Sequence, residues 1–117
     1  MKNVRIVGVP EHFNHPWQMS IASSDFHQVG IDLEWTSVPE GTGKMCEMLR
    51  ENQTDLAVIL TEGIAKDISQ GNPSVIIQKY VESPLYWGIH VAASSNLNAV
   101  EDLQGKRVAI SRYGSGS

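Results

Sequence analysis

A run of five apolar residues at positions 56–60 limits the folds open to this chain more than any other stretch. It lies within D-L-A-V-I-L-T-E-G, residues 55–63, and ends at Thr-Glu-Gly. So short an unbroken run is typical of a strand covered on both faces, at the centre of a parallel sheet. Open α/β sheets bind ligands at the carboxyl ends of their strands, so Thr61, Glu62 and Gly63 are candidate site residues. The alternative is a plain strand-to-helix turn with a capping Thr and a permissive Gly, which explains these residues fully.

The rest of the chain alternates predicted strands with predicted helices. Residues 4–9 (V-R-I-V-G-V) and 75–81 are further apolar strands, and residues 31–36 alternate apolar with polar side chains, as in a strand near the sheet edge. Helices are expected over residues 16–28, after Gly41-Thr42-Gly43, and over residues 64–70. This β-α-β-α-β-α-β order predicts an α/β fold with an open, mostly parallel sheet flanked by helices.

The first predicted helix has clear boundary signals. Pro16 suits the first helical position, and Gly30 suits the residue just past the end. Trp17 lies on the side of the helical wheel opposite the apolar residues, where it either lines a cleft or caps the core edge. The expected buried stripe consists of Met19, Ala22, Phe26 and Val29.

The pattern changes after Glu82-Ser83-Pro84. Residues 85–92 form a second extended apolar run that follows the fourth strand with no helix between, so we expect a crossover to another lobe. Asn98 and Glu101 then form a capping-box-like pair for a one-turn helix ending at Gly105, and residues 108–110 are a further predicted strand.

Composition excludes several classes of function. The 117 residues suffice for one domain, and a net charge of −4 without a Lys/Arg cluster argues against nucleic-acid binding. No apolar run approaches the roughly 20 residues of a membrane span. No export signal is present, which fits either a cytoplasmic chain or an exported one whose leader was removed, so localisation stays open. The single Cys46 excludes an internal disulfide.

The loop at residues 10–15 is the second candidate part of a site, through Glu11, His12, Phe13 and Asn14. Glu11, His12 and His15 could bind zinc together with Glu62, but their spacing is not a standard one, so no metal is predicted. No Ser-His-Asp or Cys-His arrangement and no convincing carboxylate pair can be read, so neither a catalytic residue nor a cofactor is predicted.

Two glycine-containing segments could bind an anion. Gly41 and Thr42 precede a predicted helix whose first backbone N–H groups could contact the anion. The backbone N–H groups of Gly114-Ser115-Gly116-Ser117 could contact it in the same way. Exposed turns would explain both segments equally well. Aromatic side chains after Pro84 could instead wall a pocket for a ring, or pack at the edge of the core. The candidates here are Gly41, Thr42, Tyr86, Trp87, Arg112, Tyr113 and Ser115.

These features together resemble a known family. V-R-I-V-G-V-P at the start, H-Q-V-G-I-D-L at residues 27–33 and D-L-A-V-I-L-T-E-G are similar to type II periplasmic substrate-binding proteins, in the branch that binds nitrate, sulfonates, taurine and thiamine precursors. The most specific stretch is E-D-L-Q-G-K-R-V-A-I-S-R-Y-G-S-G-S at residues 101–117, which in that family opens the second lobe. The resemblance covers the first half of such a protein. It implies lobe 1 over residues 1–82 without its return segment, a hinge over 83–94, and the beginning of lobe 2 over 95–117.

The resemblance also implies a function. A small organic solute, anionic or ring-bearing, would lie between the loops at residues 10–15, 61–63 and 111–117. The protein would be the substrate-binding component of an ABC-type transporter, with a membrane component as its partner, or a related sensor, and no enzyme. The alternative is a cytoplasmic enzyme on the same fold, resembling thiamine-pyrimidine synthase. Those enzymes carry a cysteine-rich motif, and this chain has only Cys46.

A lobe without its return segment would expose the crossover. Trp87, Ile89 and Val91 alternate along it, and an uncovered strand of this kind is a template for pairing with another chain. We therefore expect self-association through residues 82–117 if the chain is truncated.

Overall fold

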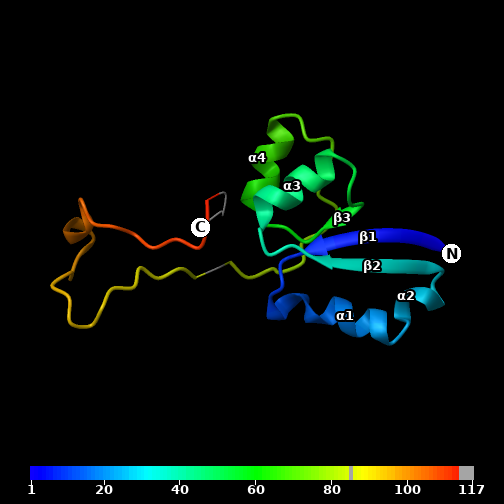
Figure 1. Ribbon diagram of the computed structural model, residues 1–117, viewed down its shortest axis with the longest axis horizontal. Coiled ribbons are helices and arrows are strands. Elements are labelled where there is room, and N and C mark those ends of the chain that lie inside the picture. The colour runs from blue at the N-terminus through cyan, green and yellow to red at the C-terminus, as the bar shows by residue number, and fades with distance from the viewer. Residues whose placement is uncertain (85, 114–117) are drawn as a thin grey trace.

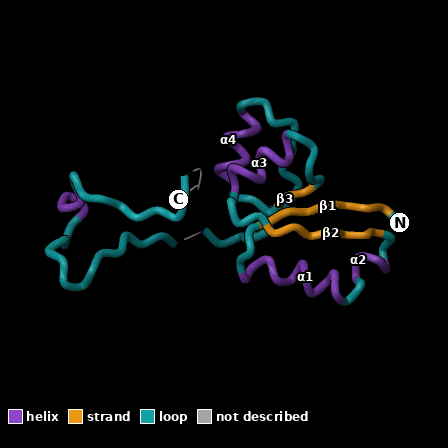
Figure 2. Tube along the Cα trace, viewed as in Figure 1, coloured by secondary structure: helices purple, strands orange, loops and turns teal. Residues whose placement is uncertain are grey.

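A parallel β-sheet with helices on both sides forms the body of the protein, and an extended segment leaves it. The computed structural model describes residues 1–84 and 86–113. Figure 2 shows the strands between one pair of helices, α1 and α2, and a second pair, α3 and α4. Residues 86–113, here called the arm, run away from the sheet and then turn back towards it (Figure 1). Because of the arm, the molecule measures 60 × 34 × 22 Å.

The sheet contains three parallel strands in the order β2-β1-β3. β1 (Lys2–Gly8) pairs along its whole length with β2 (Ile31–Ser37) and, at Ile6 and Val7, with β3 (Leu56–Ala57). The predicted α/β class and the pairing of residues 56–60 with the first strand are therefore confirmed. The expected central position of residues 56–60 is wrong, because β1 is the strand with a neighbour on each side.

The predicted strand at residues 56–60 is also shorter than expected. Beyond Ala57 a single further bond, from the Val58 N–H to the Val7 carbonyl at 2.9 Å, continues the pairing. Residues 75–81, the predicted fourth strand, are in no strand of the described chain. Val75 and Ile77 are 78% and 76% exposed. β3 therefore pairs with β1 alone, at Ile6 and Val7.

The core lies between β1 and α3 (Thr42–Arg50). Val7, Val38 and Met45 are buried together, and Met48, Ala57 and Ile59 pack against them. Met45 and Cys46 are 1% and 4% exposed, so this side of α3 faces the core.

The first predicted helix is broken in two. α1 (His15–Ala22) and α2 (Asp25–Gln28) are separated at Ser23 and Ser24, and Ser24 has a left-handed backbone with φ 62°. Pro16 lies in the first turn as predicted, and Gly30 just past the end has φ +80°. The break prevents one continuous stripe from forming along residues 16–28.

The predicted apolar stripe is therefore wrong in most of its members. Met19 and Val29 are 56% and 71% exposed, Ala22 is exposed, and Phe26 alone of the four is partly buried. Trp17 and Ile21 occupy the inward side of α1 instead. The Trp17 ring buries more apolar surface than Met19 would, which favours this rotation of α1 about its axis.

The second helix pair is joined by a polar network. α4 (Thr61–Ser69) begins at Thr61 rather than at residue 64, so residues 61–63 form its first turn. The Arg50 guanidinium of α3 pairs with the Asp67 carboxylate of α4 at 2.6 Å. The buried Asn72 amide donates to Asp67 Oδ2 at 2.7 Å and to the Cys46 carbonyl at 3.3 Å. The Asn72 bond, and then the Arg50 pair, hold the pKa of Asp67 below its usual range.

A second ion pair fixes the start of β3. The Arg5 guanidinium contacts Asp55 Oδ1 at 2.9 Å, and the Arg5 backbone N–H donates to Asp55 Oδ2 at 2.8 Å. The Arg5 side chain, together with this backbone bond, lowers the pKa of Asp55 to about 2. Both side chains stay partly open to solvent.

The arm contains one short 3-10 helix, η2 (Val100–Leu103). Its capping side chain is that of Asp102, whose carboxylate accepts from the backbone N–H groups of Asn98 (2.9 Å) and Ala99 (3.0 Å). The predicted pair of Asn98 and Glu101 is therefore wrong, because Ala99 is the N-cap and Asp102, three residues later, accepts these bonds. The predicted strand at residues 108–110 is likewise not in a strand, and Val108 is 76% exposed. No helix within residues 1–84 and 86–113 is long and apolar enough to cross a membrane.

Candidate functional site

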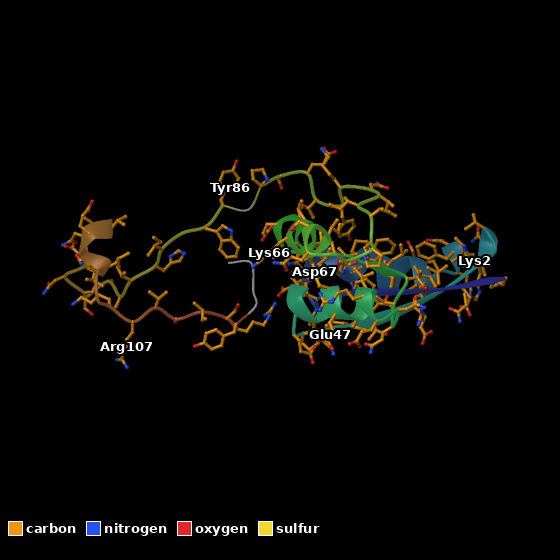
Figure 3. The ribbon with its side chains drawn as sticks, turned by 90° about the horizontal axis from the view of Figure 1, so that it is seen from above. Lys2, Glu47, Lys66, Asp67, Tyr86 and Arg107 are labelled. Atoms are coloured by element: carbon orange, nitrogen blue, oxygen red, sulfur yellow. The ribbon has the colours of Figure 1, made fainter. Side chains whose placement is uncertain are left out.

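The carboxyl ends of the three strands lie together along one side of the sheet, which is called the carboxyl edge or simply the edge below. The residues that follow β1, β2 and β3 leave the sheet there, at the end from which the chain continues towards the arm (Figure 1). η1 (His12–Asn14) and α1 follow β1, whereas α3 follows β2 and α4 follows β3. The opposite edge, marked by Lys2 in Figure 3, carries the amino end of β1. Segments distant in the sequence therefore gather at the edge where α/β folds bind ligands.

A shallow hollow of about 390 Å³ follows β1. Short backbone bonds shape the loop around it, from Glu11 N–H to the Val9 carbonyl at 2.8 Å and from Asn14 N–H to the Glu11 carbonyl at 3.0 Å. The lining brings together three of the predicted site residues, Glu11, His12 and Asn14. The full set is Val9, Pro10, Glu11, His12, Asn14, His15 and Gln18.

Asn14 is the most deeply buried polar residue of this loop. It is 1% exposed, and its Nδ2 group donates to the Val9 carbonyl at 2.8 Å. Its Oδ1 atom accepts no hydrogen bond from any described residue. A buried carbonyl oxygen without a donor costs free energy, so this atom is a polar group in need of a partner.

Trp17 lies at the edge of the core rather than in the lining of the hollow. Its ring stacks on Phe26 and Trp35 at centroid distances of 6.1 and 6.4 Å, and Tyr80 packs on it at 5.8 Å. The Tyr80 hydroxyl also donates to the Phe13 carbonyl. The segment that leads from α4 to the arm is therefore bonded to the loop around the hollow, and the Phe13 side chain is 39% exposed.

The start of α3 lies against the returning arm. Gly41 has φ +85°, and Thr42 beside it is buried. A Cβ atom added to Gly41 would lie 2.7 Å from Nε and 2.8 Å from Cζ of Arg112. Gly41 thus leaves room for the Arg112 guanidinium, and the structure brings these two predicted site residues together.

The residues after β3 do not form the predicted loop. Thr61 and Glu62 are exposed, and Gly63 packs against the Thr42 side chain. A smaller hollow of about 240 Å³ lies between α3 and α4, lined by Thr42, Gly43, Cys46, Arg50, Gly63, Lys66, Asp67 and Gln70. Figure 3 labels Lys66 and Asp67 on α4 and Glu47 on α3.

The predicted aromatic residues of the crossover do not reach the sheet edge. Tyr86 and Trp87 are 92% and 71% exposed on the arm, and Figure 3 shows Tyr86 away from the body. Tyr113 is exposed as well. Ser115, the last predicted candidate, lies outside the described residues.

Two kinds of chemistry, metal binding and nucleophilic attack by a thiol, can be checked at this edge. Among residues 1–84 and 86–113, no three His, Cys, Asp or Glu side chains are placed to hold a metal ion. Cys46 is on the buried side of α3, and burial raises the pKa of its thiol. A raised pKa leaves little thiolate at neutral pH, so Cys46 is a core residue rather than a nucleophile.

Comparison with known proteins identifies the family. Residues 25–117 match the family model described as NMT1/THI5 like. The chain belongs to the NMT1/THI5-like family. The Candida albicans CA3427 gene product, described as defining a new family with the generic periplasmic binding protein fold, is similar in structure with a TM-score of 0.57 and 30% sequence identity. The match covers 62% of this chain and 24% of that one. A comparison with curated proteins found no match.

The expected relation to the type II periplasmic substrate-binding proteins is thereby confirmed for part of such a protein. Sequence reasoning missed two residues at the edge of this NMT1/THI5-like chain. Gln18 lines the hollow, and its spacing of four from Asn14 on a helix could have indicated it. Tyr80 was assigned to a strand, and no local signal points to its bond with Phe13.

Proposed function

We propose that the chain binds a small organic solute at the carboxyl edge of its sheet. The observation that carries this proposal is the contact between Arg112 and Gly41, because it returns the arm to the edge that also holds the hollow after β1. An edge closed by segments from both ends of the chain is the arrangement that hinge closure around a solute requires. Residues 1–82 would act as one lobe, 83–94 as the hinge, and 95–117 as the start of the second lobe.

The chemistry at the start of α3 favours a negatively charged group on one end of the solute. The first N–H groups of a helix carry partial positive charge, and Arg112 adds a full one beside Gly41. A carboxylate, phosphate or sulfonate would suit this position. The protein would then act as the binding component of a transporter with a membrane partner, or as a sensor.

Thermal unfolding with a panel of solutes tests the proposal. The panel contains carboxylates, phosphates and sulfonates, with and without an aromatic ring. At least one solute is expected to raise the unfolding midpoint in a saturable manner, since a ligand at 100 times its Kd stabilises the folded state by about 2.7 kcal/mol. The rise should shrink in Arg112→Ala and persist in Lys2→Ala at the opposite edge (Figure 3). A panel without any saturable shift, or an equal shift in Arg112→Ala, would contradict it.

The competing proposal is an enzyme on the same fold. The buried Cys46, with a raised thiol pKa, argues against covalent chemistry by the sole cysteine of the chain. Mass spectrometry of a solute recovered after incubation separates the two proposals. Unchanged solute supports binding alone, and a product absent from a protein-free control supports the enzyme.

We also propose that the arm pairs with another chain through residues 82–117. Trp87 and Ile89 are 71% and 72% exposed and lie two residues apart, so they share one side of an extended segment. Covering such surface gains roughly 25 cal/mol per Å². Sedimentation velocity should show association that rises with concentration and is lost in a Trp87→Glu, Ile89→Glu variant. A wild-type chain that stays monomeric throughout would oppose this proposal.

A further inference from the structure

The hollow after β1 carries chemistry that the start of α3 does not. We infer that the part of the solute that enters this hollow donates hydrogen bonds and is neutral or positively charged. The inference rests on the proposed function and concerns which chemical group is bound there.

The first argument is the unpaired acceptor. Asn14 is almost fully buried, and its Nδ2 bond to the Val9 carbonyl fixes the orientation of the amide. Oδ1 is therefore the atom left over, and it finds no donor within the described parts of the chain. A buried acceptor left without a donor destabilises the folded chain. An N–H or O–H group brought by a solute would recover that cost, whereas a carboxylate or phosphate oxygen would not.

The second argument is the charge of the lining. The carboxylate of Glu11 is on the rim, beside His12, His15 and Gln18. No Lys or Arg is among the described residues that line the hollow, and Glu11 forms no ion pair within residues 1–84 and 86–113. An anion here would be repelled by the Glu11 carboxylate, and a cation would be attracted to it.

The third argument is that the loop is already held in shape. Two backbone hydrogen bonds within the loop, from Glu11 to Val9 and from Asn14 to Glu11, fix its shape. A third hydrogen bond, from the Tyr80 hydroxyl to the Phe13 carbonyl, holds it from the neighbouring segment. A preformed site loses little conformational entropy when a ligand binds. The volume of about 390 Å³ lies within the range of small-molecule sites and accommodates a single ring with one polar group.

Three probes of matching shape separate the possible charges. Benzamidinium is a cation with N–H donors, benzamide is neutral with N–H donors, and benzoate is an anion with acceptors alone. Each is titrated into the full chain labelled with ¹⁵N, and the amide shifts of residues 9–18 report occupancy of the hollow. We expect saturable shifts of these amides with benzamidinium, weaker binding of benzamide, and no such shifts with benzoate.

Two variants test the roles of the residues. Glu11 is exposed, so Glu11→Gln should leave folding intact. It should lower the benzamidinium affinity by up to about fivefold, to within about twofold of that of benzamide, because a charge pair near the surface contributes little. Asn14→Leu removes the acceptor and should abolish benzamide binding. Lys2→Ala at the opposite edge should change neither. If Asn14→Leu fails to fold, the Glu11→Gln comparison decides alone.

The outcomes separate this inference from the proposed function. Shifts of residues 9–18 by benzoate at or below the benzamidinium concentration would overturn it, as would the lack of a shift with all three probes. An undiminished preference for benzamidinium in Glu11→Gln would do the same. A solute that stabilises the chain through Arg112 without shifting residues 9–18 would preserve the proposed function and refute the inference alone.

Discussion

Gly8 is the position where a single methyl group would disturb both the fold and the site. It ends β1, it is buried, and its carbonyl accepts from the Val38 N–H at 2.8 Å. A Cβ atom at this position would lie 2.5 and 3.0 Å from the Cη2 and Cζ2 atoms of Trp35, and 2.9 Å from Nδ2 of Asn14. In Gly8→Ala these neighbours must therefore move. Trp35 stacks on Trp17, so its movement reaches the whole aromatic cluster.

The size of the effect follows from two opposing contributions. Forcing a methyl group into a packed site costs about 1–3 kcal/mol, and replacing Gly by Ala recovers about 0.4–1 kcal/mol by restricting the unfolded chain. We expect Gly8→Ala to lower the free energy of unfolding by about 1–2 kcal/mol. Because Asn14 has to shift, the variant should also weaken benzamide binding in the hollow.

Urea unfolding followed by far-ultraviolet circular dichroism measures the loss. Gly43→Ala is the matched control, since Gly43 is exposed in the first turn of α3 and Ala there should leave stability unchanged or raise it by up to about 1 kcal/mol. If Gly8→Ala unfolds at the same urea concentration as the wild type, with an unchanged slope, Gly8 has more room than its neighbours indicate and the reasoning fails.

Three further predictions concern contacts that hold the edge in place. Asp55 has a pKa of about 2 in the folded chain against an ordinary 3.8, so its contribution to stability is complete above the ordinary value and is lost as the pH falls towards 2. Asp55→Asn should therefore unfold more easily at neutral pH, and urea midpoints should converge with the wild type near pH 2; a gap that does not narrow would refute the assignment. Asn72→Ala should lower the free energy of unfolding by about 1–3 kcal/mol, because it removes the amide donor to the Cys46 carbonyl and to Asp67. The matched control is Gln70→Ala, which changes an exposed side chain and should be neutral in the same assay. Tyr80→Phe keeps the ring on Trp17 but removes the bond to Phe13, so amide exchange at residues 12–14 should accelerate; Tyr86→Phe on the arm should leave it unchanged, and equal rates in both variants would argue against the tie.

The sequence was sufficient to predict the features that depend on local pattern. The apolar runs at residues 4–9 and 56–60 and the alternation at 31–36 predict strands, and the connections of helical length between them make those strands parallel. Pro16 and Gly30 correctly indicate the two ends of the first helical region, because their backbone requirements act at a single residue.

Features that depend on the partners of a segment could not be predicted. Residues 75–81 have the composition of a strand, but a strand also needs a neighbour, and no described segment pairs with them. The inward rotation of Trp17 is decided by Trp35, Phe26 and Tyr80, which come from three other segments. The contact of Arg112 with Gly41 joins residues far apart in the chain, and no periodicity encodes it.

The uneven distribution of tryptophan gives the protein two optical reporters. Trp17 and Trp35 stack on each other in the body, whereas Trp87 is 71% exposed on the arm. Emission should therefore contain a component that acrylamide quenches readily, from Trp87, and one that it quenches poorly. In Trp87→Phe the remaining emission reports on the aromatic cluster next to the binding loop. Movements of the arm and changes in the body can thus be followed separately in one unlabelled sample.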